Sequence, residues 1–110
     1  MLDDKSFPLQ CDKTIEALYR SLVDAAEEHD LEADMNNGAL TVEFEDPPAK
    51  FVVSPNSPVH QIWVSAHSKS FKFEWSDQRS AFVLPDTGED LKAMMGRAVS
   101  QQLGEDVVLP

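Results

Sequence analysis

The apolar positions of the first segment recur every three or four residues, at Cys11, Ile15, Leu18, Leu22 and Ala26. This spacing predicts an amphipathic helix over about residues 12–28, with Asp12 as its N-cap. Tyr19 and Val23 flank the apolar stripe, and mostly acidic residues occupy the other side. The first segment is therefore expected to bury one face of a helix and to expose an acidic one.

The apolar period changes to two after a predicted turn at residues 36–38. Leu40, Val42 and Phe44 alternate with polar residues, which is typical of a strand with one buried face. Four further strands are predicted at residues 50–54, 59–66, 70–76 and 81–85, and prolines mark most of the breaks between them. Because the connections are short, the strands should form an antiparallel meander of about five strands.

A second helix is predicted near the C-terminus. Thr87 and Asp90 resemble a capping box, with Thr87 as N-cap and Asp90 at the N3 position. Gly104 is the expected stop, and the apolar tail after it is expected to pack back on the domain. The predicted buried stripe consists of Leu91, Met94, Met95, Ala98 and Leu103.

This order of elements predicts one α+β domain over residues 1–110. Two amphipathic helices can cover one face of a meander sheet, which gives a two-layer sandwich and leaves the other face in water. Gln61 and Trp63 fall on the open face, whereas His60 falls on the core-facing set. An exposed tryptophan among polar residues indicates a protein-binding surface; the alternative is that a loop or the C-terminal tail covers it.

The charge is strongly acidic and unevenly distributed. The chain has 20 acidic and 9 basic residues, a net charge of −11; residues 1–46 contribute 13 acids and 3 bases. Such a protein should repel nucleic acids and anionic membranes and attract cations or basic protein surfaces, unless the charge serves only solubility. With a single cysteine, no membrane-length apolar run and no apolar leader, we expect a soluble protein of a reducing cytoplasm.

Clustered carboxylates form a candidate metal site. Asp24, Glu27 and Glu28 share one helix face by their spacing, and further acids follow in the expected loop and first strand: Asp30, Glu32, Asp34, Glu43 and Glu45. A hard cation would relieve their repulsion, in a shallow and weak site, although plain solvation explains the same pattern. The histidines and Cys11 lack zinc-ligand spacing, and no catalytic motif is present.

Several runs resemble the frataxin family, in particular its bacterial branch. They are NGALTVEF, SPVHQIWVSA, FKFEW and TGEDLKAMM, within residues 7–99, and the most specific is the P-x-x-Q-I-W-V run that begins at Pro58. Where the family commonly has Asn-Arg-Gln, this chain has Ser54-Pro55-Asn56, so an arginine donor is absent.

The resemblance implies a frataxin fold and a non-enzymatic, monomeric regulator of iron–sulfur cluster assembly. It implies weak binding of Fe²⁺ or Fe³⁺ and docking on a cysteine desulfurase at an acidic ridge, onto which Asp24, Glu28, Asp30, Glu32 and Asp34 fall. It also implies that a sheet face with Asn56, Gln61 and Trp63 is directed at the scaffold protein. Two rivals are iron oxidation at the surface carboxylates and a metal-independent acidic inhibitor of a basic protein.

Overall fold

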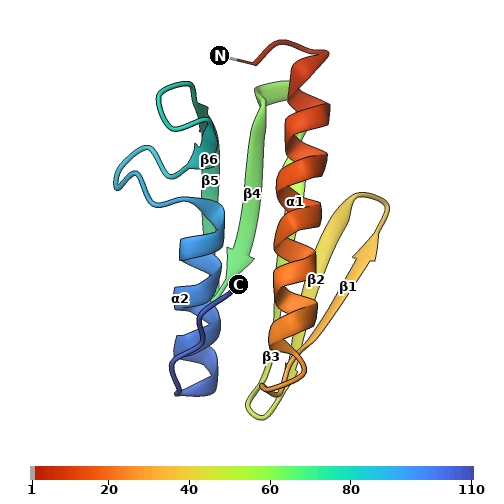
Figure 1. Cartoon of the computed structure of the whole chain (residues 1–110), viewed down its shortest axis with the longest axis vertical. Coiled ribbons are helices and arrows are strands. Elements are labelled where there is room, and N and C mark those ends of the chain that lie inside the picture. Colours follow the sequence, from red (N-terminus) through yellow and green to blue (C-terminus); the bar gives the residue numbers. More distant parts are fainter. Residues whose placement is uncertain (1) are drawn as a thin grey trace.

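The computed structural model describes residues 2–110, in which two helices lie on one face of a six-stranded sheet (Figure 1). The helices are α1 (Ser6–Ala25) and α2 (Leu91–Leu103), with a short 3₁₀ helix, η1 (Ser57–Val59). The strands are β1 (Glu32–Asn36), β2 (Ala39–Glu45), β3 (Pro48–Asn56), β4 (Gln61–Ala66), β5 (Lys69–Ser76) and β6 (Ala81–Val83). Each strand pairs antiparallel with the next, which confirms the two-layer α+β meander.

The sheet has one strand more than the five expected. Strand β1 was missed, so Glu32 and Asp34 lie on a strand and not in a loop. Its core-facing positions are only Ala33 and Met35, and Met35 is itself exposed, so the apolar alternation is weak. Asn37 and Gly38 both have positive φ, +54° and +82°, and form the two-residue turn that joins β1 to β2.

Helix α1 begins six residues earlier than predicted, so Asp12 is an interior residue and not the N-cap. The Asp3 carboxylate accepts hydrogen bonds from the backbone N–H groups of Lys5 and Ser6, at 3.1 and 2.7 Å, and these bonds lower the pKa of Asp3, the bond from Ser6 most strongly. Phe7 anchors the first turn, because it is 1% exposed and its ring lies 5.8 Å from that of Phe82.

Helix α2, in contrast, begins three residues later than predicted, because its N-cap is Asp90 and not Thr87. Asp90 is the N-cap, and its carboxylate accepts a hydrogen bond of 2.8 Å from the Ala93 N–H. The Thr87 hydroxyl instead accepts from the Glu89 N–H, in the turn before the helix. Gly104 ends the helix at φ +69°, as predicted.

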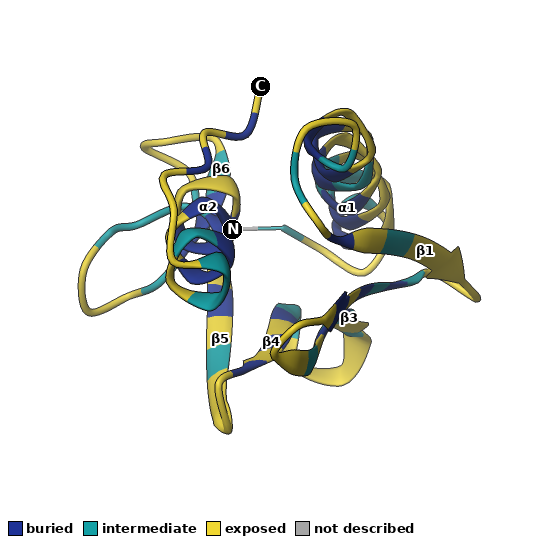
Figure 2. Cartoon of the chain, turned by 90° about the horizontal axis from the view of Figure 1, so that it is seen from below, coloured by how far each residue is buried: buried dark blue, intermediate teal, exposed yellow. Residues whose placement is uncertain are grey.

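The core lies between the helices and the sheet (Figure 2). The predicted stripes of both helices point into it, except that Ala26 and Leu103 are only partly buried. The tail packs back as expected: Val107 and Leu109 are buried, and the Ser21 hydroxyl of α1 donates to the Pro110 carbonyl at 2.6 Å. No helix within residues 2–110 combines the length and the hydropathy that crossing a membrane requires.

Two expectations around β3 and β4 were wrong. Strand β3 was expected to stop before Pro55, yet it continues to Asn56; Pro55 lies beyond the part of β3 that pairs with β2, at a free edge where proline is tolerated. His60 precedes β4 with φ +53° and is not a core residue. Its ring stacks on Phe7 at 5.0 Å, and its Nε2 lies 2.8 Å from Asp4 Oδ1.

Candidate functional site

The face of the sheet that no helix covers carries an exposed tryptophan. Trp63 lies on β4 and is 39% exposed, while its chain neighbours Ile62 and Val64 point into the core. The prediction that Trp63 lies on the open face is therefore confirmed. We call the residues on this side of β3, β4 and β5 the outer sheet face; it includes Asn56, Gln61, Trp63, Lys72 and Glu74.

Hydrogen bonds hold the indole of Trp63 in place. Its Nε1–H donates to Gln61 Oε1 at 2.8 Å, and Gln61 Nε2–H donates to Glu74 Oε2 at 2.9 Å. Gln61 and Glu74 are direct partners across β4 and β5. The exposed ring is thus oriented before any partner arrives, which lowers the entropic cost of binding.

A cation covers part of the same ring. Lys72 is the cross-strand partner of Trp63, and its Nζ lies 5.0 Å from the ring centroid. Lys72 and Glu74 were not singled out from the sequence. Their alternation with Phe71 and Phe73 on β5 indicates that they lie on the outer side of the sheet. Their position beside Trp63 and Gln61 depends on the β4–β5 register, which the alternation does not reveal.

Asn56, the last residue of β3, also lies on the outer sheet face, next to Pro55. It is the cross-strand partner of Gln61, and Ser54 is the partner of Trp63. The structure therefore brings together the three predicted partner-binding residues Asn56, Gln61 and Trp63. Apolar at its centre and polar around it, the outer sheet face resembles a small protein-binding patch.

The predicted acidic residues fall into two groups. Asp24, Glu27 and Glu28 are exposed at the end of α1 and in the turn after it, and Asp30 follows in the connection to β1. Glu32 and Asp34 on β1 lie on the same side of the sheet as Glu43 and Glu45 on β2: Glu32 is the direct partner of Glu43, and Asp34 that of Thr41.

These carboxylates are spread over a surface and do not converge. Within residues 2–110, no group of three or more His, Cys, Asp or Glu side chains is arranged to hold a metal ion. At the helix end, Asp24 and Glu28 line a hollow of about 360 Å³ together with His29, whose Nδ1 lies 3.1 Å from Glu105 Oε2. The arrangement offers oxygen ligands to a hydrated cation, with water completing its coordination.

Cys11 is a structural residue. It lies on the buried stripe of α1 and is 1% exposed, and burial raises the pKa of its thiol to about 12. The thiolate required of a nucleophile or a metal ligand is therefore suppressed. This agrees with the interpretation of Cys11 as a core side chain.

The fold and the two surfaces define the class of protein: a small α+β sandwich with an acidic helix–strand edge and a sheet face that no helix covers. A family model, described as a frataxin-like domain, matches residues 1–105. The chain belongs to the frataxin family, as the sequence motifs indicated.

Similar proteins carry a consistent name. The chain is 35% identical over 98 residues to "Iron-sulfur cluster assembly protein CyaY" of Pseudomonas aeruginosa, covering 87% of this chain and 90% of that protein. It is 35% identical over 86 residues to the protein of the same name from Aeromonas salmonicida, covering 74% and 75% of the two chains. A solved frataxin from Psychromonas ingrahamii shares the fold, with a TM-score of 0.75 over 97% of both chains at 22% identity.

Proposed function

We propose that this protein takes part in iron–sulfur cluster assembly as a regulator that binds other proteins and catalyses no step itself. The observation that carries the proposal is the exposed Trp63, held by Gln61, Glu74 and Lys72 on a sheet face without helices. An orientation fixed in advance suits a contact residue, and tryptophan is enriched at the energetic centres of interfaces. The name of the similar bacterial proteins supplies the pathway.

The outer sheet face is proposed to meet the scaffold protein, and the acidic surface a cysteine desulfurase. Residues 1–46 have a net charge of −10, from 13 acids and 3 bases. Asp24 and Glu28 lie at the end of α1, and Glu32 and Asp34 on β1, all exposed. A basic patch is the complementary partner surface, with attraction that weakens as salt rises.

Iron is proposed to bind weakly at the same carboxylates. The support is the exposure of neighbouring carboxylates, Asp24 with Glu28 and Glu32 with Glu43, whose oxygens suit a hard Fe²⁺ or Fe³⁺ ion. Because no three of these groups converge within residues 2–110, the proposed binding is weak and water supplies most of the ligands. Iron oxidation at these residues remains the rival function, and oxidation of Fe(II) faster than in buffer, lost on mutation of the carboxylates, would favour it. We further propose that the protein is a monomer of the bacterial cytoplasm.

A reconstituted assembly reaction tests the proposal. Desulfurase, scaffold, cysteine and Fe(II) are combined with and without the protein, and cluster formation is followed by absorbance. We expect the protein to change the initial rate and Trp63→Ala to remove most of that change. Leu9→Ala, at a 68% exposed position of α1, should retain it. An identical rate with and without the wild-type protein would contradict the proposal.

A further inference from the structure

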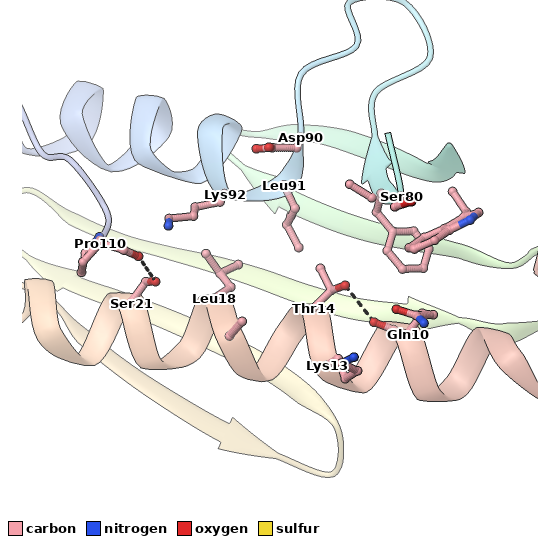
Figure 3. A pocket seen from close by; sticks show the side chains of 14 residues that line it. Gln10, Lys13, Thr14, Leu18, Ser21, Ser80, Asp90, Leu91, Lys92 and Pro110 are labelled. Atoms are coloured by element: carbon pink, nitrogen blue, oxygen red, sulfur yellow. Dashed lines mark hydrogen bonds between the residues drawn. The ribbon is translucent and has the colours of Figure 1, made fainter. Parts of the chain in front are cut away.

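Helix α1 lies between α2 and β1, and it borders a hollow on each side (Figures 1 and 2). On the side toward α2, the end of the C-terminal tail lines the hollow, where the Ser21 hydroxyl donates to the Pro110 carbonyl (Figure 3). On the other side, residues of α1 and of the β1–β2 hairpin line a hollow of about 400 Å³. We call this second hollow the α1–β1 groove.

The α1–β1 groove offers apolar surface from both of its walls. Ile15 and Tyr19 of α1 line it, the first buried and the second half-buried, and Met35 of β1 lines it with a side chain that is 38% exposed. An apolar side chain placed here would exchange water for contacts with the helix and the strand.

The surroundings of the α1–β1 groove are acidic. Asp12 and Glu16 line it and are exposed, and the base in the lining, Arg20, is already paired with Glu16. Glu32 and Asp34 on β1 add two exposed carboxylates on the outer side of the sheet. A partner at this place therefore has to bring positive charge.

Strand β1 is an edge of the sheet, and its backbone is free on one side. It pairs with β2 alone. Because a two-residue turn joins the two strands, Asn36 and Ala39 exchange backbone hydrogen bonds, and every second pair away from the turn does the same. The N–H and C=O groups of Met35 and Ala33 therefore point away from β2. No turn or loop within residues 2–110 forms a backbone hydrogen bond with either residue, so two donors and two acceptors are open to an added strand.

We propose that an extended segment of a partner protein pairs with the free edge of β1, and that basic and apolar residues alternate along this segment. Side chains of a strand alternate between its two faces. Every second residue of the added strand would therefore meet the α1–β1 groove and should be apolar, and the others would lie beside Glu32 and Asp34 and should be basic. The inference deepens the proposed function, because such a segment would belong to the basic protein that the acidic surface binds.

Charge argues against a second copy of this chain as the occupant. Two β1 edges side by side would place Glu32 and Asp34 of one copy next to the same carboxylates of the other, and like charges across a strand pair destabilise it. The strand also contains no proline or lysine, the residues that commonly block a free edge. The edge is therefore closed to acidic strands and open to basic ones.

Solvent exchange of the backbone amides tests this proposal, with the capped peptide KVKVKVK as the probe. In ¹⁵N-labelled protein saturated with this peptide, the amides of Ala33 and Met35 should exchange at least about tenfold more slowly, because the added strand forms hydrogen bonds with them. The amides of Asp34 and Asn36 already bond to β2 and should change little. Unchanged exchange at both Ala33 and Met35 would overturn the proposal.

Two further peptides separate strand pairing from attraction between charges. KKKKVVV has the same composition without the alternation and should bind at least about tenfold more weakly, because its two kinds of side chain cannot all reach their places. EVEVEVE keeps the alternation with the opposite charge and should not bind. Equal affinities of KVKVKVK and KKKKVVV would mean that charge alone holds the peptide, and would overturn the proposal.

A matched pair of variants tests the edge itself. Ala33→Pro removes the outward N–H and places a ring at the free edge, where proline is tolerated because this N–H does not bond to β2. It should weaken the binding of KVKVKVK at least about tenfold, and Ala33→Ser, which keeps the N–H, should bind as the wild type does. The amide spectrum reports whether both variants fold. Unchanged affinity of a folded Ala33→Pro would overturn strand addition and leave the proposed function standing, because the assembly reaction with the wild-type protein tests that function separately.

Discussion

Glu32 and Glu43 are direct partners across the antiparallel pair of β1 and β2, and both carboxylates are exposed. On its other side, Glu43 faces Lys50 of β3. Like charges directly opposite each other in a sheet are destabilising. The edge of this sheet therefore keeps an electrostatic conflict that a cation or a basic partner would relieve.

Removing one charge of this pair should stabilise the protein. We expect Glu32→Gln to raise the free energy of unfolding by about 0.5 kcal/mol, the usual size of a cross-strand pair effect. Urea unfolding, with the midpoint and the slope both fitted, measures it. Glu45→Gln is the control, because Glu45 faces Pro48 and should show no such gain. A midpoint for Glu32→Gln equal to or below that of the wild type would refute the repulsion.

Trp63→Ala should leave the fold intact. The side chain is partly exposed and loses one hydrogen bond and one cation–π contact, so we expect a cost of about 1 kcal/mol. Phe73→Ala, on the core side of neighbouring β5, should cost about 3–5 kcal/mol by comparison. Thermal unfolding of both variants measures the two losses of stability. Equal losses for Trp63→Ala and Phe73→Ala would mean that Trp63 is a core residue.

The N-cap of α2 can be tested by a pair of substitutions. Asp90→Ala should lower the free energy of unfolding by about 1 kcal/mol, because the Ala93 N–H loses its acceptor. Thr87→Ala removes only a bond in the preceding turn and should cost clearly less. Denaturant unfolding gives both values, and the reverse order would restore Thr87 as the cap.

Sequence patterns were most informative where a segment is strongly amphipathic. The stripes around Leu18 and Met94 and the alternation around Phe44 identified both helices and most strands, since burial of one face dictates their period. The bounds of α1 were wrong: it ends at Ala25, so Glu27 and Glu28 lie in the turn after it and not on a shared helix face with Asp24.

Strand β1 was not predicted, because only Ala33 and Met35 lie on its core side. Pairing with β2, which the local pattern does not reveal, stabilises it. The Asn37-Gly38 hairpin signal was present in the sequence and would have revealed it.

The candidate site, too, was only partly predictable from the sequence. That Trp63 is exposed follows from strand alternation alone, and the sequence predicted it. The contacts that orient Trp63 depend on which residues of β4 and β5 face each other, and this register is set by the turn between the strands. The helix starts were misplaced for a related reason. Helix α1 begins after Lys5 and α2 after Asp90, where Phe7 and Leu91 reach the core, and local spacing does not reveal this.

The thiol of Cys11 should be unreactive in the folded protein. With a pKa raised to about 12, against an ordinary value of 9.0, about one thiol in ten thousand is ionised at pH 8. Ellman's reagent should therefore react only in denaturant. Because the unfolded thiol ionises first, this group's contribution to stability is complete below pH 9 and declines as the pH rises toward 12. Rapid labelling of the native protein would contradict the buried position.

Docking of the acidic surface on a cysteine desulfurase is the central functional claim, and calorimetry with the purified desulfurase of the same organism tests it most directly. We expect binding that weakens from low to high salt and that falls at least about tenfold in Asp24→Lys/Glu28→Lys. Asp77→Lys/Asp86→Lys changes two exposed acids in the β5–β6 and β6–α2 connections, at the opposite end of the molecule from the end of α1 (Figure 1). This variant makes the same change in net charge and should bind nearly as the wild type. Equal affinity of the two double variants, or no binding at any salt concentration, would contradict the account.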